Sequence, residues 1–497
     1  MRPAPAAPAA AGRDAGRRGK VVALHSCAQD LVLPKLTPRI VPLDLTASPQ
    51  AVCARLRGRG DAVLLESSKA MPGLSGWSCV AGPPVATLET GEQETTLRRA
   101  DGVLLDTWRD PFDALRAVLG RIAHGVPHAV PFAGGLAGFI GYDLARHVER
   151  LPVIAAADPA LPRLRLHLCD HVLAYDHAAD RWWDATTHWD WTGAAGREAV
   201  WAETRERAAG PDPAPGAFQA APLVSRTPPA TYLADVQRVL DYIAAGDIFQ
   251  ANLSHRLEGA FDGDPWALYT GLTAANPAPF SAYLESADLA IASVSPERFL
   301  KLSGRDVVAR PIKGTLARGA DPADDEARRD HLAASVKDRA ENVMIVDLMR
   351  NDLGRVADTG SVAVERLFEI EPHPSVWQMV STIRARLREG LGAADLLRAC
   401  WPPGSMTGAP KVRAMEIIES LEPVRRGPYA GAIGYLDASG AMDLSVVIRT
   451  AVIAGGRVMV QVGGAVVADS LPQSELDETF AKGRLLVEVL SGRISAA

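Results

Sequence analysis

Cysteine is scarce in this 497-residue chain, and its five cysteines are widely scattered and odd in number. This pattern argues against a disulfide framework and a zinc cluster, and it fits a reducing, cytoplasmic location. No stretch approaches the roughly 18 uninterrupted apolar residues of a membrane-spanning helix, so we expect no membrane insertion. A net charge of −6 provides no basic field for a phosphate backbone, which argues against nucleic acid as a partner.

The chain divides by composition into four parts. Residues 1–20 form an Ala/Pro/Arg tail without a hydrophobic segment, so we expect a disordered extension rather than a secretory signal. Residues 21–207 mix short strand-like runs with glycine-rich turns and form an N-terminal region. Residues 208–230 are rich in Pro, Gly and Ala and are interpreted as a linker or long surface loop. Residues 231–497 carry the chemical motifs.

With 47% hydrophobic residues, the chain can bury a large core, either as two domains or as one interwoven unit. Apolar residues at helical spacing predict helices over about 232–245, 326–353 and 473–491, which end before Gly246, Gly354 and Gly492. Two β-rich runs flank Gly455-Gly456 and predict a hairpin. The pattern favours a mixed α/β fold with substantial antiparallel sheet.

A lysine lies between a proline and a glycine in Pro311-Ile312-Lys313-Gly314-Thr315. The backbone of this segment can turn closely around a ligand and present a primary amine. Such an amine is a nucleophile only when burial or nearby positive charge lowers its pKa. From these residues alone, a solvated lysine beside a turn is an equally good interpretation.

Two other segments carry candidate chemistry. The apolar run Ile291–Leu300 contains one carboxylate, Glu297, directly after Pro296. The small-residue loop Pro403–Lys411 precedes a predicted helix at 412–421, and bare N–H groups there suit an anion. The simpler alternative for the loop is a tight strand-to-helix connection.

Carboxylates occur in two pairs at helical i, i+3 spacing, Asp338 with Glu341 and Glu475 with Glu478. Each pair projects from one face of a predicted helix, and four carboxylates can hold a hard cation such as Mg²⁺. On spacing alone, two solvated acidic faces are the more economical interpretation.

Together, these segments resemble the chorismate-utilising enzymes. With Lys313 in Pro-Ile-Lys-Gly-Thr, the chain resembles the aminodeoxychorismate synthase component I family in particular. The sister family, anthranilate synthase component I, typically has alanine at this position. The resemblance is strong over about 231–490 and thinner before it. It implies a large α/β (α+β) fold in which two antiparallel sheets pack face to face with helices outside.

The resemblance also implies a reaction, the amination of chorismate at C4 to 4-amino-4-deoxychorismate on the branch to 4-aminobenzoate and folate. Lys313 would attack C2 while Glu297 protonates the departing hydroxyl group. Gln250 stands where water-adding relatives have a lysine base, and its neutral amide points to ammonia as the nucleophile. A buried amide satisfied by the backbone is the alternative for Gln250.

Arg449 lies in an apolar strand-like run, where its planar fork suits a carboxylate unless the strand face is exposed. The implied substrate-binding positions are Gly314, Thr315, Thr407, Gly408, Ala409, Tyr435, Arg449, Gly463, Gly464 and Lys482. The implied Mg²⁺ ligands are Glu341 and Glu478, with Glu475 and Asp338 as secondary ligands. Two positions depart from the family pattern: Gln378 replaces a histidine of many members, and Ala465 replaces a third glycine.

No Gly-x-Cys-x-Gly elbow occurs in the sequence, so ammonia would come from a separate glutamine amidotransferase subunit. Leu64–Ser68 and Asn276–Ser281 resemble the tryptophan pocket of the family. Two alternatives therefore stand beside the amination: anthranilate synthase component I, which Lys313 opposes, and a non-catalytic, tryptophan-binding paralogue.

Overall fold

A computed structural model describes residues 37–58, 61–71, 73–373 and 376–493. These belong to one contact-defined unit, Leu36–Ala497. The predicted N-terminal tail lies outside the described residues. None of the described helices is long and apolar enough to cross a membrane.

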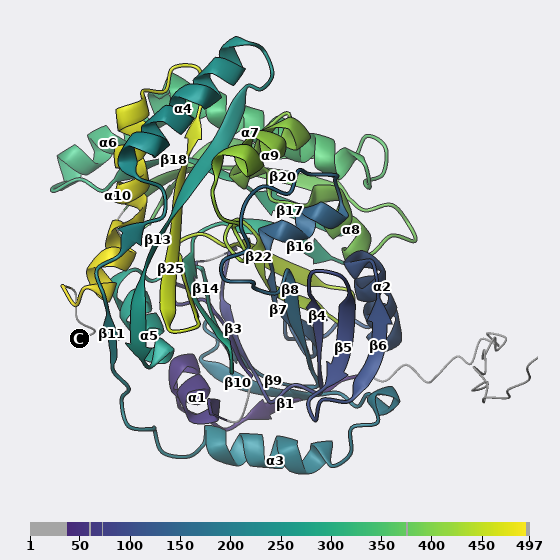
Figure 1. Cartoon of the computed structure of the whole chain (residues 1–497). Helices are drawn as coiled ribbons and strands as arrows, with labels where there is room; N and C mark the ends of the chain where they lie inside the picture. Colours follow the sequence, from purple (N-terminus) through teal and green to yellow (C-terminus); the bar gives the residue numbers. More distant parts are fainter. Residues whose placement is uncertain (1–36, 59–60, 72, 374–375, 494–497) are drawn as a thin grey trace, which may run out of the picture. The chain divides into compact units, whose positions relative to one another are not determined.

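Thirteen described strands form one antiparallel sheet, which we call sheet I (Figure 1). Its order is β1 (Arg39–Leu43), β10 (Arg181–Thr186), β9 (His171–Asp176), β3 (Trp77–Ala81), β2 (Ala62–Glu66), β14 (Phe280–Ser286), β15 (Leu289–Ser295), β24 (Thr450–Ala454), β25 (Arg457–Val466), β13 (Gln250–Gly263) and β11 (Phe218–Ala220). The short strands β12 (Val224–Ser225) and β21 (Gly408–Ala409) also pair with β13.

Twelve described strands form the second antiparallel sheet, sheet II. Its order is β18 (Ile312–Ala317), β20 (Val376–Arg386), β17 (Asp306–Arg310), β16 (Arg298–Ser303), β23 (Met442–Val446), β22 (Ala432–Asp437), β7 (Gly135–Ile140), β8 (Leu164–Cys169), β4 (Ala86–Thr90), β5 (Thr95–Arg99) and β6 (Leu104–Trp108). Strand β19 (Ala363–Pro372) pairs with β20.

Helices connect the strands and cover the sheets. They are α1 (Pro49–Leu56), α2 (Pro111–Ile122), α3 (Arg197–Ala208), α4 (Pro229–Ala244), α5 (Pro265–Ala275), α6 (Pro322–Ala334), α7 (Val336–Gly354), α8 (Ala393–Cys400), α9 (Lys411–Leu421) and α10 (Pro472–Leu490). Three short 3₁₀ turns, η1 (Tyr142–His147), η2 (Asp190–Thr192) and η3 (Gly404–Met406), complete the described elements.

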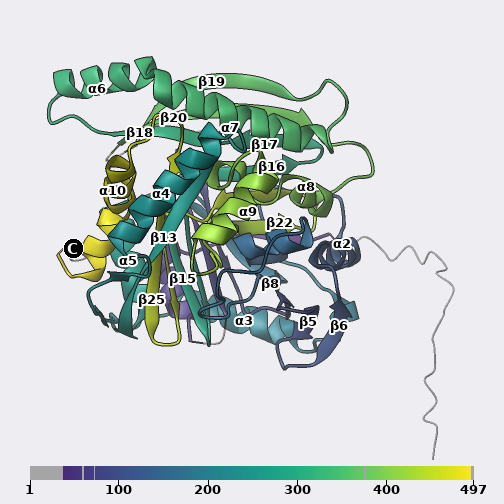
Figure 2. The ribbon, with the colours of Figure 1, turned by 45° about the horizontal axis from the view of Figure 1, so that its top comes forward.

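The two sheets pack face to face across a shared apolar core. That core includes Ile291 and Val452 of sheet I and Phe139 and Ile433 of sheet II. Helices α2, α7, α8 and α9 share a second core with sheet II, and α1, α5 and α10 share a third with sheet I. Figure 2 shows α7 and the neighbouring part of sheet II from another side. The predicted arrangement of two antiparallel sheets with outer helices is confirmed.

Several predicted elements occur with small shifts. Helix α4 covers the segment predicted at 232–245, and α10 covers the one predicted at 473–491. The hairpin of β24 and β25 turns at Gly455 and Gly456, whose φ angles of +57° and +70° are left-handed. Glycine adopts these angles without strain, which explains the strength of the sequence signal.

Two predicted segments differ from the structure. The helix expected over 326–353 is two helices, α6 and α7, that meet at Ser335. The Ser335 hydroxyl accepts a hydrogen bond from the backbone N–H of Asp338 and so caps α7. The stretch 208–230, interpreted as a linker or loop, contains β11 and β12, which extend sheet I along β13.

Two of the places where the chain crosses from one sheet to the other lie side by side. Pro296 and Glu297 connect β15 of sheet I to β16 of sheet II, and residues 447–449 connect β23 of sheet II to β24 of sheet I. The crossings are joined because the Val446 N–H donates to the Glu297 carbonyl oxygen at 2.9 Å and the Val294 N–H donates to the Arg449 carbonyl oxygen at 3.1 Å. Glu297 and Arg449 therefore stand where the two sheets separate.

Candidate functional site

The predicted nucleophile, Lys313, lies on β18 beside the first turn of α7. A Cβ atom on Gly314 would come within 3.0 Å of Oδ1 of Asp338, and Gly314 has a φ of +87°, so glycine is needed there. Nζ of Lys313 donates a hydrogen bond to the carbonyl oxygen of Ser405 at 3.1 Å. Burial lowers the pKa of Lys313, which favours the neutral, nucleophilic amine.

The predicted acid, Glu297, is only 4% exposed. Burial raises its pKa to about 7, although a hydrogen bond from the Ser405 hydroxyl group and the charge of Lys313 act to lower it. Ser405 thus contacts both groups, Lys313 through its carbonyl oxygen and Glu297 through its hydroxyl group. An amine with a lowered pKa and a carboxyl group with a raised pKa are the pair that nucleophilic attack with protonation of a leaving group requires.

Gln250 begins β13 and is fully buried. Among the described residues, neither Nε2 nor Oε1 of this amide has a hydrogen-bond partner. Leaving a buried polar group without a hydrogen bond costs about 1–3 kcal/mol of stability. A bound molecule that hydrogen-bonds to these two atoms would remove that cost. The alternative drawn from the sequence, an amide satisfied by the backbone, does not occur.

The small-residue loop lies directly beside Gln250, because β21 pairs with the first residues of β13. The carbonyl oxygens of Ala409 and Thr407 accept hydrogen bonds at 2.7 Å from the N–H groups of Phe249 and Asn252, respectively. A Cβ atom on Gly408 would meet the backbone oxygen of Gln250 at 2.2 Å, so this approach requires glycine. The loop is held as an added strand rather than as a free turn before a helix.

A buried ion pair that the sequence did not predict fixes this loop. The guanidinium group of Arg426 pairs with Glu422 at 2.6 Å. Arg426 also donates hydrogen bonds to the carbonyl oxygens of Met406 at 2.7 Å and Asn252 at 2.6 Å. The pair therefore ties the loop that precedes β21 to β13. Its sequence signal is weak, because Glu and Arg four residues apart are common on exposed helices.

The predicted metal carboxylates lie on α7 and α10, which meet beside Lys313. Nζ of Lys337 is 3.9 Å from Oε1 of Glu341 on α7 and 3.8 Å from Oε1 of Glu475 on α10. Oε2 of Glu475 is buried without a hydrogen-bond partner among the described residues. The two helices therefore direct one carboxylate from each predicted pair toward Lys337, which no sequence motif had indicated.

Glu478 and Lys482 form an ion pair at 2.6 Å, one turn apart on α10. Lys482 also donates a hydrogen bond to the carbonyl oxygen of Gly463 at 3.3 Å. A Cβ atom on Gly464 would come within 3.0 Å of Oε2 of Glu475. Gly464 therefore leaves room for the Glu475 carboxylate, while a Cβ atom on Gly463 would meet the backbone oxygen of Leu253 at 2.7 Å.

The carboxylate cluster is open rather than a closed cage. Within the described ranges, the ligand atoms of these four carboxylates do not all lie within 4.8 Å of one another. Burial raises the pKa of Glu341 and of Glu475, which is the effect of holding carboxylates out of water. Every possible ligand atom of the cluster is an oxygen, and Oε2 of Glu475 has no hydrogen-bond partner among the described residues. The cluster therefore fits Mg²⁺, which takes oxygen ligands and keeps several waters.

Arg449 stands at the second crossing with a φ of +52°, a strained angle for an arginine. Its guanidinium group has no hydrogen-bond or ion-pair partner among the described residues, and burial lowers its pKa. Arg449 is half-buried, and an unpaired guanidinium group withdrawn from water is costly unless an anion binds it. The predicted role of Arg449 as a carboxylate ligand therefore agrees with its surroundings.

Two predicted substrate-binding residues are placed differently. Tyr435 stacks on Phe132 with ring centroids 4.9 Å apart, and it lines a cavity with Ser67 and Phe280. Tyr435 lies on β22 and packs against the core between the sheets. Thr315 is exposed on β18.

Gln378 lies opposite Thr315 on β20 and is 2% exposed. Like Gln250, it has an unpartnered buried atom, Oε1. The position that departs from the family pattern therefore carries a second amide with an unpartnered atom, on the strand that pairs with the lysine-bearing β18.

The segments Leu64–Ser68 and Asn276–Ser281, which resemble a tryptophan pocket, meet at the cavity lined by Tyr435. The hydroxyl groups of Ser68 and Ser281 are 2.7 Å apart, and Ser68 accepts a hydrogen bond from the Ala278 N–H at 2.9 Å. The structure therefore brings these two distant segments together.

A second cluster of possible ligands, His124, His128 and Asp437, lies at the end of sheet II. Nε2 of His128 is 2.9 Å from the Asp437 carboxylate and Nδ1 is 2.6 Å from the Val130 carbonyl oxygen. Both ring nitrogens face acceptors, so both carry protons and neither offers a lone pair to a metal. Burial acts to lower the pKa of His128, but the hydrogen bond to Asp437, the charge of Asp437 and the hydrogen bond to Val130 together raise this pKa.

Comparisons with known proteins identify the chain's relatives. A sequence model described as chorismate binding enzyme matches residues 63–488. Aminodeoxychorismate synthase component 1 of Salmonella typhimurium is 44% identical over 430 residues, 85% of this chain and 91% of the relative. Anthranilate synthase component 1 of Streptomyces coelicolor is 39% identical over 92% of this chain and 89% of the relative. The crystal structure of anthranilate synthase component I from Streptococcus pneumoniae superposes with a TM-score of 0.73 at 29% identity, covering 90% of this chain and 99% of that one.

Proposed function

This chain belongs to the chorismate binding enzymes, and we propose that it aminates chorismate at C4 to give 4-amino-4-deoxychorismate. The observation that carries the proposal is the contact of Lys313 and Glu297 with the same residue, Ser405, at the point where the sheets separate. The name of the Salmonella relative supports the same reaction.

In the proposed reaction, the neutral amine of Lys313 forms a bond to C2 of chorismate while the C4–oxygen bond breaks. Glu297 gives its proton to the departing hydroxyl group, which leaves as water. A pKa of about 7 keeps a substantial fraction of Glu297 protonated near neutral pH, as a general acid requires. The lowered pKa of Lys313 increases the fraction of neutral amine, which is the form that can attack C2.

Ammonia then adds at C4, the bond between C2 and Nζ of Lys313 breaks, and one proton of the new ammonium group returns to Glu297. The net change is replacement of the hydroxyl group by an amino group, with water released. Gln250 supports this step, because its two unpartnered amide atoms can orient ammonia without deprotonating water.

The carboxylates of chorismate need two anchors. We propose Arg449 for one, since its guanidinium group is half-buried and has no partner among the described residues. Glu341, Glu475 and Glu478 would hold Mg²⁺, with Asp338 nearby, and the bound ion supplies positive charge for the second carboxylate. Burial acts to raise the pKa of Glu478, but the charge and hydrogen bond of Lys482, together with the charges of Lys337 and Lys313, lower this pKa overall and keep Glu478 charged.

We propose a separate glutaminase subunit as the source of ammonia. The relatives' designation as component 1 supports a second component, and the sequence lacks a glutaminase elbow. The four described cysteines are buried free thiols, which suits a reducing cytoplasm. We further propose that the cavity of Ser67 and Phe280 holds tryptophan as a structural ligand.

The second candidate function is anthranilate synthesis, which the Streptomyces and Streptococcus relatives favour. The products distinguish the two, because anthranilate formation releases pyruvate and aminodeoxychorismate keeps the enolpyruvyl group. The purified chain should convert chorismate, Mg²⁺ and ammonium chloride to 4-amino-4-deoxychorismate without pyruvate. Release of one pyruvate per chorismate would instead assign the chain to anthranilate synthesis, and absence of any turnover would favour the non-catalytic alternative.

A further inference from the structure

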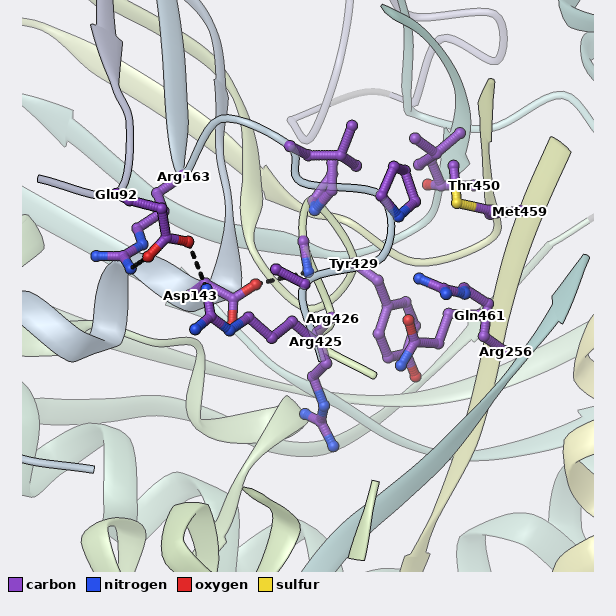
Figure 3. A pocket seen from close by; sticks show the side chains of 16 residues that line it. Glu92, Asp143, Arg163, Arg256, Arg425, Arg426, Tyr429, Thr450, Met459 and Gln461 are labelled. Carbon is purple, nitrogen blue, oxygen red and sulfur yellow. Dashed lines mark hydrogen bonds and ion pairs between the residues drawn. The ribbon is translucent and has the colours of Figure 1, made fainter. Parts of the chain in front are cut away.

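A cavity that is not lined by Lys313 or Glu297 has more arginine than acidic side chains in its lining (Figure 3). Arg256 of β13 and Gln461 of β25 line it from sheet I, and Arg163 and Arg425 line it from the loops around sheet II. Figure 3 shows Arg256 directed toward Tyr429 at one end and Arg163 and Arg425 gathered around Glu92 at the other.

Arg256 is the central observation. It is 5% exposed, and its Nε and Nη2 atoms have no hydrogen-bond partner among the described residues. Its nearest carboxylate, Glu258, lies 3.2 Å from Nε but outside hydrogen-bonding geometry. Leaving donors of a buried guanidinium group unpaired is costly, so the arrangement calls for an acceptor that the described residues do not supply.

The carboxylates near Arg256 are already shared. Glu258 also lies 3.3 Å from Arg226 and 3.7 Å from Arg457, and these two arginines both pair with Asp158. Three guanidinium groups therefore share two carboxylates. One positive charge of this group therefore remains uncompensated, and Arg256 is the one arginine of the three that lines the cavity.

The opposite end of the cavity repeats this imbalance. Arg163 and Arg425 both bind Glu92, and the Nε atom of each is buried without a hydrogen-bond partner in the described ranges. The other acidic group of the lining, Asp143, accepts a hydrogen bond from the Gly427 N–H. Burial raises the Asp143 pKa, so it compensates little of the arginine charge.

We propose that this cavity binds a small oxyanion, a phosphate or a carboxylate, on the unpartnered nitrogens of Arg256. A planar guanidinium fork matches the oxygens of either anion, and the positive charge around it excludes ammonium and metal cations. The inference does not depend on the proposed amination.

The anion site abuts the substrate site through two residues of its wall. Thr450 lines the cavity and directly follows Arg449, the proposed carboxylate anchor. Tyr429 also lines it, and the guanidinium carbon of Arg426 lies 5.8 Å from the Tyr429 ring centre. A bound anion therefore stabilises the wall behind the catalytic region without contacting the reacting groups.

The test is thermal unfolding of the full chain, free of Mg²⁺, in sodium phosphate against sodium chloride at equal pH and ionic strength. Phosphate should raise the Tm by about 1–3 °C and saturate with concentration, since only the folded protein has the site. Parallel titrations with sulfate and acetate separate a tetrahedral oxyanion from a carboxylate.

Arg256→Gln should abolish the anion-specific rise in Tm. Arg226→Gln should keep it, because Arg226 belongs to the same charge cluster but does not line the cavity. No specific rise in the wild type, or an equal rise in Arg256→Gln, would overturn the proposal.

If the Arg256→Gln chain does not fold, a second measurement on the wild-type chain still tests the proposal. Crystals of the wild-type chain soaked in selenate should show an anomalous peak within hydrogen-bond distance of Arg256. An empty cavity at saturating selenate, together with no specific rise in the wild-type Tm in acetate, would contradict the proposal.

Discussion

Replacing Glu297 by Gln should make the protein less active and, at high pH only, more stable. The structure holds this carboxyl group 4% exposed and moves its pKa from 4.5 to about 7 through burial. Glutamine keeps the shape and the capacity to hydrogen-bond with Ser405, but it cannot give a proton to a leaving hydroxyl group.

The magnitude follows from proton linkage. Between pH 4.5 and 7 the folded protein keeps the Glu297 proton while the unfolded chain releases it, so stability falls as pH rises through this window. The loss is absent below pH 4.5, complete above pH 7, and amounts to about 3 kcal/mol. Glu297→Gln removes this pH dependence.

Urea unfolding at pH 4.5 and pH 8 measures the effect, with the exposed Glu389→Gln as the control. The free energy of unfolding of Glu297→Gln relative to wild type should increase by about 3 kcal/mol from the lower to the higher pH. The same variant should lose about 10²–10⁴ in kcat as a missing general acid. An equal stability difference at both pH values, or near-normal turnover, would refute the reasoning.

Three further outcomes are expected. Turnover should be abolished when Mg²⁺ is removed, and also by either of the substitutions Glu341→Gln and Glu478→Gln, while the circular dichroism spectrum and Tm stay near those of the wild type. Full activity in excess chelator would contradict the metal site. Arg449→Gln should raise the KM for chorismate about 10- to 100-fold, as loss of a charged hydrogen bond worth about 1.5–3 kcal/mol predicts, and an unchanged KM would remove Arg449 from the site. The isolated chain should use ammonium salts but not glutamine, with more free ammonia at higher pH, and turnover of glutamine by the pure chain would reveal an unrecognised glutaminase.

The sequence predicted the parts of the fold that depend on local signals. The apolar periodicity of α4 and α10 and the paired glycines of the β24–β25 turn each determine their own structure. The break at Ser335 was missed because apolar spacing continues across it, although a serine three residues before Asp338 is an N-cap signal. Strands β11 and β12 were missed because edge pairing to β13 rests on backbone hydrogen bonds rather than side-chain pattern.

The site could be predicted only in part for a related reason. Motif resemblance indicated Lys313 and Glu297, but their meeting at Ser405 depends on Pro296 breaking one apolar run into strands of two different sheets. The place of Tyr435 at the cavity of Ser67 and Phe280 could not be predicted, because strand parity and register decide which face of β22 it occupies. The buried Glu422–Arg426 pair gives no sequence signal distinct from that of an exposed helix pair.

The central claim is that Lys313 forms a covalent bond to the substrate. The most direct test is intact-mass spectrometry with peptide mapping of the chain, quenched after incubation with chorismate and Mg²⁺ in the absence of ammonia. The account predicts an added mass of chorismate less one water on the peptide that contains Lys313, lost on addition of ammonium and absent from Lys313→Ala. An unmodified Lys313 in the wild type, together with near-normal amination by Lys313→Ala, would contradict it.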